Sequence, residues 1–300
     1  MEKKSAGFSK LAVIIPTHNR KKELKNLLDQ IDNQKVKGNY SITTVVVVDG
    51  STDGTLEMLE IYYPNIQIVH GDGNWWYTKS MNEGFKYAVE NINPNYILTL
   101  NDDIELAEDY FDEMQKTIRK NDDKTIVGSL GVTKTKPYKI VTSGNSYKYK
   151  MLGLYKHHLP FLSEVKPNEL TGMYPSITLP GRGILIPVPI LKELNGFDEK
   201  FLQYHSDGDF TLRATKKGYS VKINWNMKIY VYIEKTNNTA SFLNKNILVL
   251  IRNYFNPVSR YYLPDKIRFI WRHSYILMFP LKFGLFIFLS ILNLYRKKKV

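Results

Sequence analysis

Residues 42–55 read Ile-Thr-Thr-Val-Val-Val-Val-Asp-Gly-Ser-Thr-Asp-Gly-Thr. The run from Ile42 to Val48 is β-branched throughout, which is typical of a central strand in a parallel sheet that is buried on both faces. The run stops at Asp49 and Gly50, and a segment with helical character follows from Thr55 to Tyr62. The order of strand, loop and helix predicts one βα unit of an α/β protein.

The same order repeats on both sides of this stretch. Apolar runs predict strands, and apolar residues at helical spacing predict helices. The strands expected in the first half are 11–15, 42–48, 66–69 and 96–100, and the helices are 20–34, 55–62, 81–89 and 107–118. Four such units predict a doubly wound, mostly parallel sheet. Residues 133–179 are irregular and predict hairpins or long loops. Regular structure is then expected as strands at 183–187 and 221–225 and helices at 188–194 and 207–217.

Composition excludes several classes of protein. The chain has 300 residues, of which 43% are hydrophobic and 24% charged, so it is neither wholly disordered nor a polytopic membrane protein. It has no cysteine, which excludes disulfides, cysteine-ligated metals and thiol nucleophiles. The net charge is +13, but eleven of the 42 Lys and Arg residues follow Asn244. The positive charge is therefore concentrated in the tail, and we expect no nucleic-acid partner.

Polar residues follow the expected strands, at the edge of the sheet where open parallel sheets bind ligands. Asp49 could accept a hydrogen bond from a nucleobase or a ribose, or it could cap the next helix. Asn101, Asp102 and Asp103 could hold a divalent ion together with a diphosphate, or they could be the acidic start of a helix. The chain lacks the glycine-rich motifs of dinucleotide-binding oxidoreductases and P-loop proteins, which argues against both classes.

Four segments in this order resemble the inverting family 2 glycosyltransferases, which have the GT-A fold. They are Leu-Ala-Val-Ile-Ile-Pro-Thr-His-Asn-Arg (11–20), Val-Val-Val-Val-Asp-Gly-Ser-Thr-Asp-Gly-Thr (45–55), Leu-Asn-Asp-Asp (100–103) and His-Ser-Asp-Gly-Asp-Phe-Thr-Leu-Arg (205–213). The resemblance covers roughly residues 10–230. Gly-Asp-Gly-Asn-Trp-Trp (71–76) is similar to a branch with rhamnosyltransferase-like and galactofuranosyltransferase-like enzymes.

The resemblance implies a role for each matching position. Asp207 is the expected general base, and Asp209 is the second candidate, with a contact to the acceptor. From the residues alone, these two aspartates could equally be an N-cap pair. Asp103 and Asn101 would hold Mg²⁺ or Mn²⁺. The residues expected to bind the donor are Pro16, Thr17, Arg20, Asp49, Asp102 and Arg182.

Two features qualify these roles. Many relatives have a metal-binding histidine on the strand after Trp225, where this chain has Tyr230-Val231-Tyr232 instead. Trp75 and Trp76 are expected to contact the acceptor by stacking on a sugar, although core packing is the other interpretation. Because the two are adjacent, we expect at least one of them to face the cleft.

The tail predicts an association with a membrane surface. Ser274 to Tyr295 is strongly apolar, contains Lys282, and is followed by Arg296-Lys297-Lys298-Lys299. A helix lying in the interface of an anionic membrane explains the lysine and the aromatic residues. A spanning helix and a core or dimer helix are the alternatives. With no secretory signal evident at the start of the chain, we expect a location at the cytoplasmic face of the membrane.

These observations predict a GT-A domain over residues 1–235, with a nucleotide-binding half at about 10–130 and a catalytic half at about 131–235. Residues 236–300 would form a helical, membrane-associating segment. The expected activity is inverting transfer of a sugar, with rhamnose as one candidate, from a UDP- or dTDP-linked donor to a glycan or lipid-linked glycan of the cell surface. A sugar-nucleotide nucleotidyltransferase and a non-catalytic glycan- or nucleotide-binding module are the alternatives.

Overall fold

A mixed sheet forms the centre of the protein. The structure, a computed structural model, describes residues 10–38, 41–232 and 246–295. Its strands run in the order β10-β12-β6-β11-β4-β1-β2-β3, with β5 beside β12 and β7 beside β6. Their bounds are β1 (Leu11–Thr17), β2 (Ile42–Asp49), β3 (Gln67–Gly71), β4 (Tyr96–Thr99), β5 (Ile104–Leu106), β6 (Thr125–Thr133), β7 (Ile140–Thr142), β10 (Met173–Pro175), β11 (Ile184–Pro187) and β12 (Ser220–Val231). Strands β3, β2, β1 and β4 are mutually parallel, as are β6 and β12, and β11 runs antiparallel between the two groups. The predicted α/β class with a mostly parallel sheet is confirmed.

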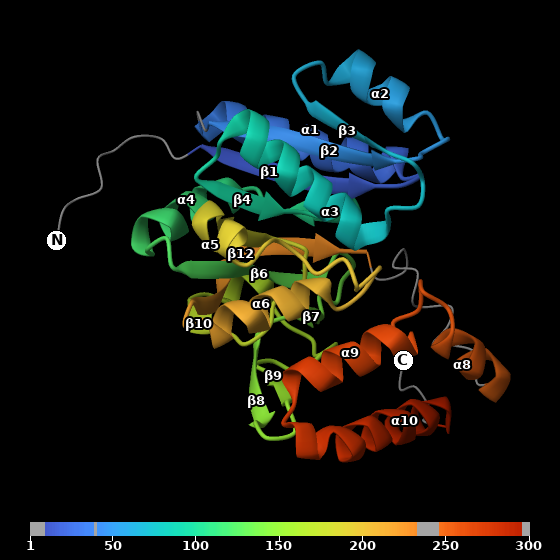
Figure 1. Cartoon of the computed structure of the whole chain (residues 1–300). Coiled ribbons are helices and arrows are strands. Elements are labelled where there is room, and N and C mark those ends of the chain that lie inside the picture. The colour runs from blue at the N-terminus through green and yellow to red at the C-terminus, as the bar shows by residue number, and fades with distance from the viewer. Residues whose placement is uncertain (1–9, 39–40, 233–245, 296–300) are drawn as a thin grey trace.

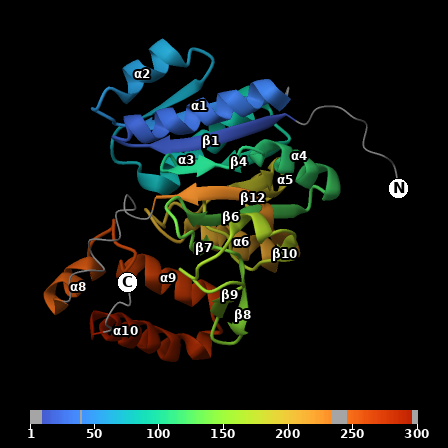
Figure 2. The same ribbon diagram turned by 180° about the vertical axis from the view of Figure 1, so that it is seen from behind.

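Helices cover both faces of this sheet. Their bounds are α1 (Lys21–Gly38), α2 (Thr55–Tyr62), α3 (Trp76–Tyr87), α4 (Tyr110–Lys120), α5 (Val188–Glu193), α6 (Ser206–Lys216), α8 (Ile247–Tyr254), α9 (Leu263–His273) and α10 (Phe279–Tyr295), with short turns at Ala88–Ile92, Pro167–Glu169 and Ile276–Met278. Successive side chains of β1 point to opposite faces. Val13 and Ile15 pack in the core with α1, α2 and α4, whereas Ala12 and Ile14 pack with α3, α5 and α6. Figure 1 shows α3 in front of the sheet, and the view from behind in Figure 2 shows α1.

Strands β5 and β6 were not expected from the sequence, and β12 is longer than expected. Strand β6 is buried throughout, but its glycines interrupt the apolar pattern. A Cβ atom at Gly128 would lie 2.5 Å from the Leu179 side chain, so glycine is needed there for close packing. The boundary expected at 130/131 falls inside β6, so the sheet is continuous across the two halves. The irregular middle contains an antiparallel hairpin, β8 (Asn145–Tyr149) and β9 (Leu154–His157).

The C-terminal helices lie on one side of the sheet domain, at the end opposite α2 (Figure 1). Helix α10 packs against α8 and α9, and α9 packs against α6. The boundary expected at residue 235 lies outside the described residues. Among the helices that the structure describes, none combines the length and the apolar character needed to cross a membrane.

Two helical glycines give a matched test of the core. A Cβ atom at Gly84 of α3 would lie 2.4 Å from Ile14, whereas at Gly284 of α10 it would meet nothing within 4 Å. We expect Gly84→Ala to lower the free energy of unfolding by about 1–3 kcal/mol through overpacking. Gly284→Ala should raise it by about 0.5–1 kcal/mol, because alanine loses less backbone entropy. Urea unfolding measures both. An unchanged stability in Gly84→Ala would contradict the tight contact of α3 with β1.

Candidate active site

A cleft of about 380 Å³ lies at the carboxyl ends of β1, β2 and β4. It brings together most of the predicted site residues, although they come from distant parts of the chain. Those that line it are Pro16, Thr17, Arg20, Asp49, Trp76, Asn101, Asp102, Asp103, Arg182 and Asp207. The lining residues that the sequence analysis did not single out include Tyr77, Gly181, Gln203 and Tyr204. The other two predicted residues, Trp75 and Asp209, are not part of this lining.

One wall of the cleft carries two buried carboxylates that share an arginine. Arg20 lies 3.0 Å from an oxygen of Asp102 and 3.0 Å from an oxygen of Asp103. Burial, together with the nearby Asp103, raises the pKa of Asp102 to about 7 despite the attraction of Arg20. The second oxygen of Asp103 and the amide oxygen of Asn101 are buried without a hydrogen-bond partner. These two oxygen atoms are therefore available as ligands for a cation.

Asp49 organises the loop that follows β3. Its carboxylate accepts hydrogen bonds from the backbone N–H groups of Gly73, at 2.7 Å, Trp75, at 3.0 Å, and Trp76, at 3.2 Å. The carboxylate thus acts as a cap for the start of α3, while the residue remains part of the cleft lining. Contact with a nucleobase or a ribose stays a prediction for Asp49.

Asp207, in the first turn of α6, also lines the cleft. Gly181 N–H donates to one of its carboxylate oxygens at 2.6 Å, and Gly208 N–H donates to the other at 2.7 Å. Burial raises the pKa of Asp207, and these two N–H groups and the charge of Arg182 offset only part of the rise. A half-buried carboxylate with a raised pKa is a stronger proton acceptor than an ordinary aspartate.

Gly181 is held in place from two sides. Its carbonyl accepts from the Thr99 hydroxyl at the end of β4. A Cβ atom at Gly181 would lie 1.8 Å from the Tyr77 hydroxyl, so no larger residue fits while Tyr77 keeps its place. The Tyr77 hydroxyl is buried without a hydrogen-bond partner. The sequence offered no signal for this pair, because the two residues are far apart in the chain.

The sequence profile of glycosyl transferase family 2 matches residues 12–165, just over half of the chain. The chain belongs to this family. The matched segment contains the wall with Asp102 and Asp103 but ends before Asp207.

Other comparisons agree with this family 2 assignment. Low-salt glycan biosynthesis hexosyltransferase Agl10 from Haloferax volcanii is 22% identical over 212 residues, which cover 70% of this chain and 63% of that protein. The chain therefore spans less than two thirds of the length of that curated relative.

Solved structures support the GT-A fold. The structure of GalNAc-T7 with UDP, GalNAc and Mn²⁺ has a TM-score of 0.59 at 15% identity, covering 94% of this chain and 58% of that chain. The Pyrobaculum calidifontis mannosyltransferase PcManGT with GDP-Man and Mn²⁺ has a TM-score of 0.57 at 14% identity, covering 98% of this chain and 77% of that chain. At these identities, the likeness shows the fold.

The acidic wall of this family 2 domain fits a divalent ion in part. Hard cations prefer carboxylate and amide oxygens, and Asp103 and Asn101 each have one free. Within the described residues, however, no three acidic, histidine or cysteine side chains are grouped closely enough to form a metal cluster. The remaining ligands would therefore have to come from a bound diphosphate or from water. Tyr232, in the region where many relatives have a histidine, donates to Glu105 outside the cleft lining.

The adjacent Trp75 and Trp76 of this family 2 domain lie in different surroundings. Trp76 lines the cleft, is 38% exposed and has a left-handed backbone with φ of 57°. Such a conformation is costly for a bulky residue and is kept only where the surroundings impose it. Trp75 packs against the core, with Lys79 over its ring. The prediction that at least one tryptophan faces the cleft is confirmed, and it is Trp76.

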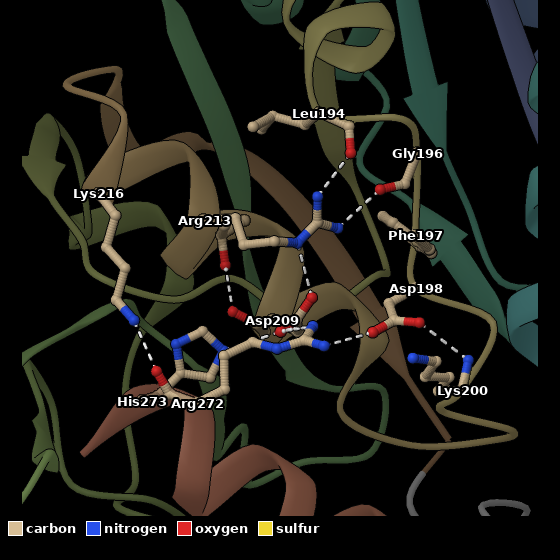
Figure 3. A network of polar contacts seen from close by, with 12 residues as sticks. Leu194, Gly196, Phe197, Asp198, Lys200, Asp209, Arg213, Lys216, Arg272 and His273 are labelled. Carbon is tan, nitrogen blue, oxygen red and sulfur yellow. Dashed lines mark hydrogen bonds and ion pairs between the residues drawn. The ribbon is translucent and has the colours of Figure 1, made fainter. Parts of the chain in front are cut away.

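Asp209 lies in a buried polar network instead of the cleft. Its carboxylate accepts from Arg213 at 2.7 Å, from Arg272 at 2.8 Å and from His273 at 2.8 Å (Figure 3). Arg213 also donates to the carbonyls of Leu194 and Gly196. Burial works against ionisation, but these three donors lower the pKa of Asp209 to about 2. The placement favours a structural role that joins α6 to α9, and it does not support the predicted contact with the acceptor.

The network predicts acid-sensitive stability. The pKa of folded Asp209 lies below the unfolded value near 4, so its ionised form stabilises the native state by about 2 kcal/mol above pH 4. This contribution should be lost as the pH falls from about 4 to about 2. We expect Asp209→Asn to lower the free energy of unfolding at pH 7 by about 2–3 kcal/mol, since it removes the anion that two partly buried arginines share. It should also flatten the loss of stability below pH 4.

Urea unfolding between pH 2 and pH 7 measures both effects. Asp123→Asn, at an exposed position, is the matched control and should change neither quantity. Equal stability of Asp209→Asn and the control would show that the network does not hold α9 on α6.

Proposed function

We propose that this chain is an inverting glycosyltransferase that moves a hexose or deoxyhexose from a nucleoside-diphosphate sugar to an acceptor hydroxyl. The placement of Asp207 carries the proposal. This carboxylate has a raised pKa and lines the same cleft as Asp102, Asp103 and Arg182. A sugar nucleotide bound in this cleft would meet a base and groups for its diphosphate in one lining.

The chemistry follows from this arrangement. Asp207 takes the proton of the acceptor hydroxyl as its oxygen attacks the anomeric carbon. The bond from that carbon to the diphosphate oxygen breaks on the opposite face, so the configuration inverts. Arg182 lines the cleft and can pair with the diphosphate. A divalent ion held by Asp103 and Asn101 would supply further positive charge for the leaving diphosphate.

The identities of the donor, the sugar, the acceptor and the metal are part of the same proposal. A UDP- or dTDP-linked donor, with rhamnose among the first sugars to test, follows the resemblance of the segment at 71–76. The relative Agl10 is named for glycan biosynthesis, which supports a growing glycan as acceptor. The crystal structures of GalNAc-T7 and PcManGT contain a nucleotide or a nucleotide sugar together with Mn²⁺, which supports the class of donor and the metal.

Release of nucleoside diphosphate tests the proposal. Wild type is incubated with UDP-, dTDP- and GDP-sugars and Mn²⁺ or Mg²⁺, with and without a lipid-linked glycan acceptor. We expect one donor to be consumed and EDTA to stop its turnover. Asp207→Asn should lower kcat by about 10²- to 10⁴-fold while nucleotide binding is retained. Because burial raises the pKa of Asp207, kcat/KM should fall with acid at a pH above the value near 4 of an ordinary aspartate.

The control for this experiment is Asp123→Asn, which keeps the same change of charge away from the cleft and should retain wild-type turnover. Wild-type turnover in Asp207→Asn would remove Asp207 from the role of base. Donor binding without turnover under every condition would favour the non-catalytic binding module.

We also propose that the C-terminal helices lie on the cytoplasmic face of a membrane, where a lipid-linked acceptor would be found. Trp271, Leu277, Leu281 and Phe288 are 57%, 85%, 60% and 61% exposed. Exposed aromatic and aliphatic side chains beside basic ones are typical of helices that lie in a membrane interface.

Co-sedimentation with anionic vesicles tests this association. Leu277→Asp should lower the bound fraction several-fold, since it places a negative charge among the apolar side chains. Ile61→Asp is the matched control, because Ile61 is 69% exposed on α2, at the other end of the molecule (Figure 1). Equal binding of the two variants would place the contact with the membrane elsewhere.

A further inference from the structure

A second cavity of about 700 Å³ adjoins the cleft. It is lined by residues of α9, α10, the β8–β9 hairpin and the start of α6. Pro180, Arg182, His205 and Asp207 line both the cleft and this cavity. A ligand in the second cavity would therefore lie beside Asp207.

Four cationic side chains line the cavity, namely Arg182, Arg260, Lys266 and Lys282. Lys282 is 8% exposed and donates to the carbonyl of Gly153 at 3.1 Å. The amine of Lys266 lies 5.1 Å from the centre of the Phe286 ring. Within the described chain, no carboxylate forms an ion pair with either lysine, and Asp207 is the one acidic residue among those that line the cavity.

Their surroundings disfavour the charged forms of the two lysines. Burial lowers the pKa of Lys282 to about 8. Burial and the neighbouring charges of Arg260 and Lys282 lower the pKa of Lys266 to about 8. Two lysines gathered at a partly buried site, neither of them in an ion pair with a carboxylate, are typical of a binding site for an anion.

Two further features narrow the chemistry of that anion. Tyr155 and His205 line the cavity, and the hydroxyl of Tyr155 and the Nε2 atom of His205 are buried without hydrogen-bond partners. Part of the lining is apolar, with Phe269, Leu285, Phe286 and Leu289. A ligand that matches this lining joins a phosphate-type anion to a hydrocarbon chain.

We infer that the second cavity binds the phosphate or diphosphate group of a lipid-linked acceptor, with Lys266 and Lys282 on the anion and the apolar side chains of the lining on the first part of the lipid. This inference rests on the proposed function and assigns the acceptor its site. The glycosyl end of the acceptor then extends toward Asp207. The phosphate of a nucleic acid carries no hydrocarbon chain that could pack against the apolar side chains of the cavity.

Binding of farnesyl diphosphate to the whole chain tests the inference. Isothermal titration calorimetry is carried out in EDTA, so that the diphosphate cannot bind through a metal in the donor cleft. We expect inorganic pyrophosphate and farnesol each to bind at least tenfold more weakly than farnesyl diphosphate. Equal binding of pyrophosphate would overturn the lipid part of the inference, and equal binding of farnesol would overturn the anionic part.

Variants locate the binding. Lys266→Gln and Lys282→Gln should each weaken farnesyl diphosphate binding at least tenfold, and Lys192→Gln, an exposed lysine on α5, should not. If Lys282→Gln is unfolded, as its melting curve would show, Lys266→Gln carries the test alone. Unchanged binding in a folded Lys266→Gln overturns the site.

Variants of the cleft and of the second cavity distinguish this inference from the proposed function. Asp103→Ala should keep farnesyl diphosphate binding, and Lys266→Gln should keep nucleotide binding. Binding of farnesyl diphosphate without any binding of a nucleotide sugar would defeat the proposed function and leave the anion site in place. Binding of the nucleotide sugar without farnesyl diphosphate would defeat the inference alone.

Discussion

The carboxylate of Asp209 is the interaction on which the geometry of the site depends. It has no exposure to solvent, and it is stable as an anion because Arg213, Arg272 and His273 donate to it. Arg272 and His273 belong to α9, and Arg213 also holds the carbonyls of the loop after α5. A buried charge without such partners would cost several kcal/mol. Asp207 lies two residues before Asp209, in the same first turn of α6. The orientation of α6, and with it the position of Asp207, is thereby coupled to the C-terminal helices.

This coupling joins segments that are far apart in the chain. The cleft uses the carboxyl ends of parallel strands, where open α/β sheets generally bind ligands. The second cavity needs α9 and α10, which reach the sheet domain partly through the Asp209 network. One hydrogen-bonded cluster therefore positions both the base and the cavity beside it.

The sequence was sufficient for those parts of the site that depend on local pattern. The continuous apolar or β-branched runs at 11–15 and 42–48 are typical of buried strands, so Thr17 and Asp49, which follow them, could be placed at one edge of the sheet. Asp207 came from the resemblance of 205–213 to a known family. Strand β6 was missed because Gly128 and Gly131 interrupt its apolar run. The partners of Asp209 were missed because Arg272 is 63 residues away, and no local pattern encodes such a pairing.

The contact between Gly181 and Tyr77 has a consequence for how this chain can change during evolution. Any side chain at 181 would collide with the hydroxyl of Tyr77, and the N–H of Gly181 donates to Asp207. Position 181 therefore cannot change alone without shifting Tyr77 or the backbone that holds Asp207. A larger residue at 181 should be tolerated only in descendants of this sequence that have also lost the hydroxyl, or the whole ring, at 77.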